Sequence, residues 1–96
     1  MKVKNLNGTS QTTCKCGSWL EHWENFSGKK APKYCVVSEC TKKNLVGAHV
    51  QKDSYADKGW YIIPICKSCN GKHGQDLIIS DSTTLVSANK RKTCDK

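Results

Sequence analysis

Two pairs of cysteines carry the spacing of a metal site. Two residues separate Cys66 from Cys69, and four residues separate Cys35 from Cys40. With two to four intervening residues, a tight turn aims both thiolates of a pair at one tetrahedral ion. Both pairs stand among polar residues instead of inside apolar runs, which argues against simple buried thiols. The sequence therefore predicts one structural Zn²⁺ bound by four thiolates.

Three further cysteines leave the question of a second site open. Cys14 and Cys16 are separated by one residue, which is less than the usual spacing of a metal-binding pair. One of these thiols could join Cys94, His22 or His49 around a second zinc ion. Spare buried thiols, or a disulfide that closes the two chain ends, are the alternatives.

The composition explains why a metal would be needed. Only 17 of the 96 residues are Leu, Ile, Val or Phe, and a core of that size rarely stabilises a domain alone. No apolar segment has the length of a signal peptide core or a membrane span. We therefore expect a reducing, cytoplasmic location and no membrane partner. In that compartment clustered cysteines bind zinc more often than they form disulfides, and seven cysteines cannot all pair.

The charge of the chain indicates a polyanionic partner. Sixteen Lys and Arg residues face eight Asp and Glu residues, which gives a net charge of +8. Such an excess predicts contact with DNA or RNA, although it also serves solubility. Arg91 is the single arginine, so few side chains can make bidentate contacts with a base. We expect binding that is sensitive to salt and reads little sequence.

The elements that position these residues are short and mixed, which predicts an α+β fold. Residues 1–13 lack periodicity and are expected to be a flexible lead-in to a single domain over residues 14–96. Ser18 should cap an amphipathic helix over residues 19–26, with Glu21 completing a capping box. This helix should pack its apolar face, formed by Trp19, Leu20, Trp23 and Phe26, on the core, with His22 at the edge of that face. Further on, the pattern predicts a hairpin of residues 34–37 and 45–50 and a short helix at the second cysteine pair. It also predicts an apolar strand over 60–65, which Pro64 restricts to an edge or to a strand that ends there.

The segment from Cys35 to His73 resembles the HNH endonucleases of the ββα-metal, or His-Me finger, group. Zinc-stapled members of that group place a cysteine pair before a strand that ends in Asp-His, then a loop, an apolar strand and a Cys-x-x-Cys-Asn motif. Here the same order is Cys35 to Cys40, Ala48-His49-Val50, residues 60–65, and Cys66 to His73. The resemblance implies a small zinc-stapled domain of treble-clef or ββα-metal type, with an N-terminal amphipathic helix added.

The resemblance also implies catalytic roles. His49 takes the place of the general base that activates water against a phosphodiester, Asn70 that of the central Asn, and His73 that of a ligand for Mg²⁺ or another divalent ion. Ala48 stands where members usually carry Asp, so the carboxylate would have to come from another residue, for which the candidates are Asp53, Asp57 and Asp76. Without the resemblance, His49 is explained as a core residue or a zinc ligand, and His73 as a zinc ligand or a solvated side chain.

Three functions follow from these observations. The first is a metal-dependent endonuclease of HNH type with His49, Asn70 and His73 at its centre. The second is a catalytically inactive, zinc-held module that binds nucleic acid or an acidic protein through its lysines. The third is a small interaction protein in which the positive charge serves solubility alone. An acidic side chain close to His49 and Asn70 would distinguish the first from the second.

Overall fold

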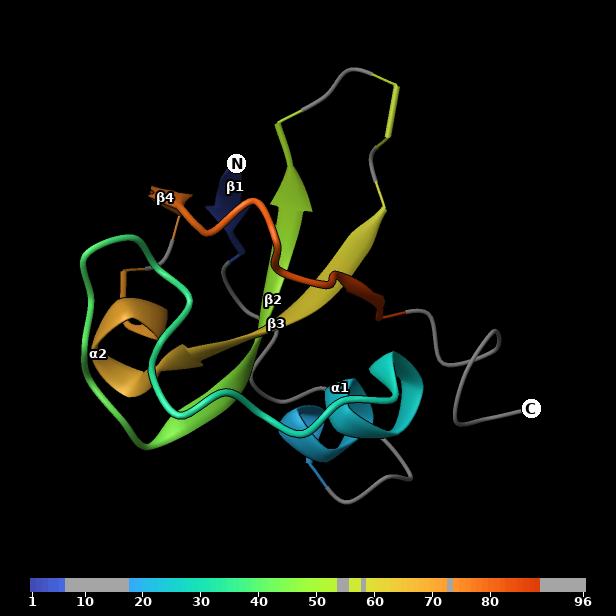
Figure 1. The fold of residues 1–96 in the computed structure, drawn as a ribbon. Helices are drawn as coiled ribbons and strands as arrows, with labels where there is room; N and C mark the ends of the chain where they lie inside the picture. The colour runs from blue at the N-terminus through green and yellow to red at the C-terminus, as the bar shows by residue number, and fades with distance from the viewer. Residues whose placement is uncertain (7–17, 54–55, 58, 73, 89–96) are drawn as a thin grey trace.

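The computed structural model describes residues 1–6, 18–53, 56–57, 59–72 and 74–88. Within this part of the chain, an antiparallel sheet with the strand order β4-β1-β2-β3-β5 is accompanied by two helices. The β2–β3 hairpin forms the centre of the fold (Figure 1). Helix α2 follows at the end of β3, and α1 lies beside the hairpin, away from α2. The elements are β1 (Lys2–Asn5), α1 (Trp19–Ser27), β2 (Leu45–Lys52), β3 (Trp60–Cys66), α2 (Lys67–Asn70), β4 (Asp76–Ile78) and β5 (Val86–Ser87).

The β2–β3 hairpin divides the apolar residues between two faces of the sheet. Its register runs from Leu45 opposite Cys66 to Gln51 opposite Trp60. Because side chains alternate along a strand, Ala48 and Val50 share one face, and His49 lies on the other. The first face packs in the larger core cluster, which also contains the cysteines that are buried. The second face carries Ile62 and packs against α1.

Helix α1 forms as its sequence predicts. Ser18 is the N-cap, and its hydroxyl accepts a hydrogen bond from the backbone N–H of Glu21 at 3.1 Å. At the other end Gly28 takes the left-handed conformation with φ 71°. Trp23 is buried against Ile62 and Val86, so this indole fills the smaller core cluster. Phe26 was expected to face the core as well, but it is 45 % exposed.

Two expectations about strands are corrected. Residues 2–5 were assigned to a flexible lead-in, yet they form β1 between β4 and β2, with Val3 fully buried. Residues 34–37 do not form a hairpin with β2, because β2 pairs with β1 and β3 instead. Val37 makes only an isolated bridge with Ile79. Residues 7–13 of the predicted lead-in lie outside the described residues.

The apolar strand β3 is internal to the sheet, although Pro64 still has no ladder partner on one side. β5 pairs with Tyr61 and Ile62 only, so it ends before Pro64. The Pro64 carbonyl accepts a bond from the Val36 N–H at 3.4 Å on that side. The missing N–H of proline therefore interrupts no pairing with β2.

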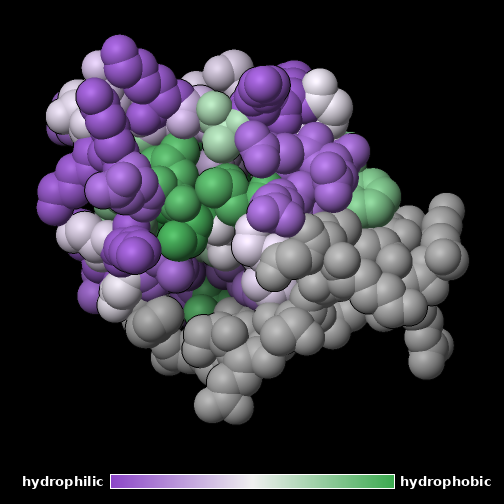
Figure 2. Space-filling view, turned by 90° about the horizontal axis from the view of Figure 1, so that it is seen from below, coloured by the Kyte–Doolittle hydropathy of each residue, from purple (hydrophilic) through white to green (hydrophobic). Residues whose placement is uncertain are grey.

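The surface and the helices add two simple observations. Seen from below, Figure 2 shows hydrophobic residues grouped at the centre of this face and surrounded by hydrophilic ones.

Among the described residues, neither the nine-residue α1 nor the four-residue α2 is long and apolar enough to cross a bilayer, which takes about 20 residues.

Candidate metal centre

Four cysteine sulfurs converge at the end of the β2–β3 hairpin. Cys66 ends β3 and Cys69 lies in α2, whereas Cys35 and Cys40 belong to the loop between α1 and β2. The Sγ atoms of Cys40 and Cys66 are 3.8 Å apart, those of Cys69 and Cys40 are 3.9 Å apart, and all four lie within 4.8 Å of one another. The two predicted pairs are thus brought together at one point, and these four thiols are free.

These distances suit a tetrahedral zinc ion. Zinc–sulfur bonds of about 2.3 Å at tetrahedral angles separate the sulfurs by roughly 3.8 Å, close to the observed spacings. A disulfide would need about 2.05 Å. Thiolate ligands favour Zn²⁺ over Mg²⁺, which prefers oxygen. The four residues could therefore hold a metal ion, and their chemistry is consistent with structural zinc.

The loop that carries the first pair is shaped by backbone bonds. We call residues 35–40 the zinc loop. The Cys35 N–H donates to the Lys42 carbonyl and the Cys40 N–H donates to the Val37 carbonyl, each at 3.0 Å. Glu39 takes the left-handed conformation with φ 65°, which reverses the chain just before Cys40. This turn replaces the strand that the apolar residues 34–37 had suggested.

The protonation of the thiols also points to a cation. Burial raises the pKa of the Cys35 thiol, and burial followed by the bond to Cys66 raises that of Cys69 to about 12. Burial also opposes ionisation of Cys66, but the Cys69 N–H and the neighbouring thiols outweigh it and lower this pKa to about 7. The cluster therefore stabilises one thiolate, that of Cys66, without a metal ion. A full set of four needs the charge of a bound dication.

His49 occupies the opposite face of the sheet and is surrounded by aromatic rings. Its side chain is only 5 % exposed. The imidazole centroid lies 4.5 Å from that of Trp19 and 6.3 Å from that of Trp60, both edge to face. Burial lowers the pKa of His49 to about 4, and His22 contributes through charge repulsion. His49 is therefore a neutral, enclosed imidazole near pH 7.

We predict that His49 remains neutral well below its ordinary pKa of 6.5. As the pH falls from about 6.5 to about 4, the unfolded chain takes up a proton there before the folded protein does. The free energy of unfolding therefore decreases across this window, by about 3 kcal/mol in total. An NMR titration of the His49 ring proton in zinc-loaded protein should give a midpoint near 4. A midpoint near 6.5 would contradict the enclosed position.

The structure separates His49 from the helix that carries Asn70. Ala48, the neighbour of His49, lies in the larger core cluster with Cys69 of α2, so α2 packs on the face that His49 does not share. Asn70 accepts a hydrogen bond at its backbone carbonyl from Asn5 Nδ2 at 2.9 Å. His73 lies outside the described residues, as do Cys14, Cys16 and Cys94.

The three candidate carboxylates lie in ion pairs elsewhere. Lys2 Nζ is 3.5 Å from Asp53 and 3.9 Å from Asp76. Asp57 accepts a bond from the Tyr61 hydroxyl at 2.6 Å and pairs with Lys52 at 3.2 Å. The Tyr61 hydroxyl, the Gly59 N–H and Lys52 together lower the pKa of Asp57 to about 2. These contacts place all three carboxylates at the β1–β4 pair and the loop end of the hairpin.

The likeness to HNH endonucleases rests on residue order. Comparisons with protein-family models, with curated proteins and with solved structures find no match to this chain. The family therefore stays a prediction. What the structure shows is a small α+β fold with a four-cysteine cluster that is compatible with zinc.

The sequence does not indicate the buried contacts of two polar residues. Asn5, 1 % exposed, bridges β1 to the end of α2, and its buried Oδ1 has no hydrogen-bond partner among the described residues. His22 was expected at the edge of the helix but is fully buried, with its Nε2 2.8 Å from the Ser87 carbonyl. Neither position has a local pattern that marks it, because both partners are distant in sequence.

Proposed function

We propose that this chain is a zinc-held nucleic-acid-binding module of treble-clef type that binds without cleaving. The observation that carries the proposal is a basic and aromatic patch beside the zinc loop. Lys33 Nζ and Lys43 Nζ approach the Tyr34 ring at 5.5 and 5.8 Å from its centroid, and Tyr34 is 44 % exposed. We call Lys33, Tyr34 and Lys43 the basic patch.

The patch belongs to a strongly basic segment that the metal site would order. Residues 28–44 contain one acidic residue, Glu39, and the five lysines Lys29, Lys30, Lys33, Lys42 and Lys43. Cys35 and Cys40 lie between Lys33 and Lys43, so bound zinc would fix the two lysines on one surface. Ammonium groups around an exposed ring match a phosphate backbone with an unstacked base. This favours DNA or RNA over an acidic protein.

The same chemistry sets the expected location and specificity. Reduced thiols that bind zinc fit the cytoplasm, where we propose that the module acts. Lysines contact phosphates as point charges and read little base sequence. Binding would therefore be tight only at low salt and nearly independent of sequence.

Binding should depend on the basic patch more than on charge in general. The double variant Lys33→Gln/Lys43→Gln should weaken binding of a labelled single strand about tenfold at low salt. It should also reduce the slope of log K against log salt by roughly 1.4, because two phosphate contacts are lost. Fluorescence anisotropy at several salt concentrations measures both.

The matched control is Lys67→Gln/Lys72→Gln, which removes the same charge from exposed positions at α2. We expect it to weaken binding less than threefold. Equal losses of affinity in both double variants would mean that the basic patch contributes only through the overall charge of the protein. No binding of duplex or single strand at low salt would reject nucleic acid as the partner.

An HNH-type endonuclease is the second candidate, and the order of elements favours it. His49 lies on the β2–β3 hairpin, and α2, which carries Asn70, follows directly. In this alternative His49 is the base, and Asn70 and His73 hold Mg²⁺ or another divalent ion. Plasmid nicking with Mg²⁺, Mn²⁺ or Ni²⁺, abolished in a folded, zinc-loaded His49→Ala variant, would replace the binding proposal. Absence of nicking in the parent and in Ala48→Asp would leave the binding module.

A further inference from the structure

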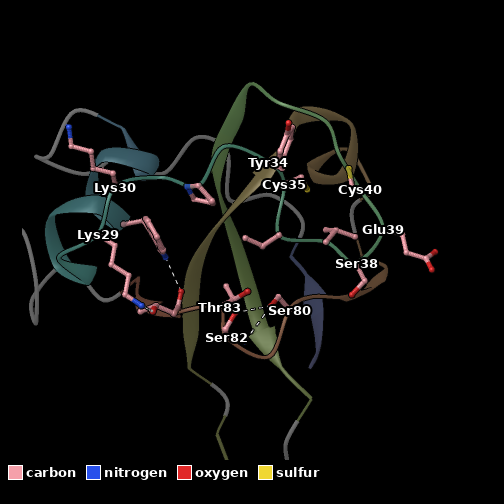
Figure 3. A pocket seen from close by; sticks show the side chains of 15 residues that line it. Lys29, Lys30, Tyr34, Cys35, Ser38, Glu39, Cys40, Ser80, Ser82 and Thr83 are labelled. Atoms are coloured by element: carbon pink, nitrogen blue, oxygen red, sulfur yellow. Dashed lines mark hydrogen bonds between the residues drawn. The ribbon is translucent and has the colours of Figure 1, made fainter.

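A cavity of about 490 Å³ lies between the loop after α1, the zinc loop and the turn before β5 (Figure 3). Its apolar lining includes Trp23, Pro32 and Val36. The polar lining comprises Lys29, Lys30, Glu39 and several hydroxyl groups, among them those of Ser80, Ser82, Thr83 and Thr84 on the turn. Cavities of 300 to 1,000 Å³ with a few fixed polar groups are typical of small-molecule sites.

One end of this cavity carries a positioned ammonium group that could bind an anion. Lys29 Nζ donates to Thr84 Oγ1 at 2.9 Å, and Trp23 Nε1 donates to the Thr84 carbonyl at 2.9 Å, so both side chains are held in place. Within the described residues no carboxylate pairs with Lys29. Its charge is therefore available to a ligand at the hydroxyl-lined end.

Thr83 supplies an independent sign of a missing partner. Its Oγ1 is buried and makes no hydrogen bond to any residue that the structure describes, although Thr83 lines the cavity. A buried hydroxyl without a partner is costly, and native proteins rarely retain one without a reason. A rotation about χ1 would let this hydroxyl meet a ligand oxygen placed near Lys29. The orphaned hydroxyl is explained if the cavity binds an oxyanion.

The opposite end of the cavity has the opposite character. Cys35 and Cys40 line it there, and Tyr34 stands beside them (Figure 3). With zinc bound, four thiolates leave a net charge of about −2, which repels a second anion and attracts N–H donors. A fitting ligand has a phosphate at one end and a flat ring with an amino group at the other. The exocyclic amine of adenine or cytosine is such a donor.

We propose that this cavity binds a nucleoside monophosphate, with its phosphate at Lys29 and Thr83 and its base toward Tyr34 and the zinc loop. The nucleotide is either free or the 5′-phosphorylated end of a strand that crosses the basic patch. Binding of a strand end rests on the proposed function, because Tyr34 belongs both to the cavity and to the basic patch. Binding of a free nucleotide does not rest on it.

Calorimetric titration of zinc-loaded protein with adenosine monophosphate tests the proposal. Lys29→Gln should weaken binding at least tenfold, because a charge-assisted bond is lost. Lys30→Gln is the matched control: it removes the same charge from the neighbouring residue, which also lines the cavity but whose ammonium group lies away from the hydroxyl-lined end that Lys29 reaches (Figure 3). This control should change affinity less than twofold. Thr83→Val should weaken binding about fivefold and raise the Tm of the free protein, since it removes the orphaned hydroxyl.

Several results would overturn the proposal. These are no binding of adenosine monophosphate, equal losses in Lys29→Gln and Lys30→Gln, or binding of adenosine or inorganic phosphate as tight as that of the nucleotide. Oligonucleotides with and without a 5′-phosphate distinguish the sources. If the protein prefers the phosphorylated strand and Lys29→Gln abolishes this preference, the ligand is a strand end. If the protein binds both strands equally but binds adenosine monophosphate tightly, the ligand is the free nucleotide. Nucleotide binding that survives in Lys33→Gln/Lys43→Gln separates this site from the proposed function.

Discussion

Chelation of the metal is expected to unfold this domain. The four thiols join the end of β3, α2 and the zinc loop, which otherwise rest on a small apolar core. Zinc bound by four thiolates contributes about 10 to 16 kcal/mol of apparent binding free energy, as much as the whole net stability of a typical domain. After chelation, ¹H–¹⁵N NMR spectra should lose their dispersion, and added Zn²⁺ should restore it where Mg²⁺ does not.

Single substitutions localise the effect. Cys69→Ser should reproduce the loss of metal and fold, because it removes a buried ligand. Ser68→Ala, in the same helix but exposed, is the matched control and should keep both. A dispersed spectrum from protein shown to be free of zinc would contradict the structural role.

The second large effect is expected from Gly47→Ala. A Cβ atom added to Gly47 of β2 would lie 2.6 Å from both the Leu20 backbone nitrogen and the Trp19 carbonyl oxygen. No rotamer change relieves a clash with backbone, so α1 must move away from the sheet. We expect a loss of about 3 kcal/mol in the free energy of unfolding, measured by urea denaturation of zinc-loaded protein.

Gly71→Ala is the control for this substitution. The nearest atom to its added Cβ is the Ser68 carbonyl oxygen at 3.4 Å, and Gly71 has right-handed helical angles. We expect a change within about 0.5 kcal/mol. Equal effects of the two substitutions would mean that α1 does not pack as closely on β2 as the structure shows.

The correct predictions from sequence are those with local causes. Ser18 and Glu21 predicted the start of α1, because a cap involves residues three positions apart. Likewise, the spacing within each cysteine pair depends on one local turn of the chain, so each pair could be predicted from sequence. The structure confirms that the two pairs meet, as the ligands of one ion would.

The incorrect predictions concern contacts between distant residues. Residues 2–5 hold one aliphatic side chain, Val3, and become a strand because β2 and β4 lie on either side. Residues 34–37 have the composition of a strand, but the turn at Glu39 and the backbone bonds of Cys35 and Cys40 place Cys35, Val36 and Val37 in the zinc loop. Such pairings depend on the whole sheet, which a local pattern does not contain.

The role of His49 shows the same limit at the site. Residue order places His49, Asn70 and His73 as in an HNH endonuclease, but order does not say on which face of the sheet each helix packs. The structure puts α1 over His49 and α2 on the opposite face. For this reason the proposed function rests on the basic patch beside the four-cysteine cluster, and the catalytic assignment depends on the nicking assay.

The zinc centre is tested most directly by X-ray absorption at the zinc edge of the full chain loaded with one equivalent of Zn²⁺. The convergence of Cys35, Cys40, Cys66 and Cys69 predicts a single shell of four sulfurs at about 2.3 Å. A shell of nitrogen or oxygen ligands, or a folded protein that binds no zinc, would contradict it.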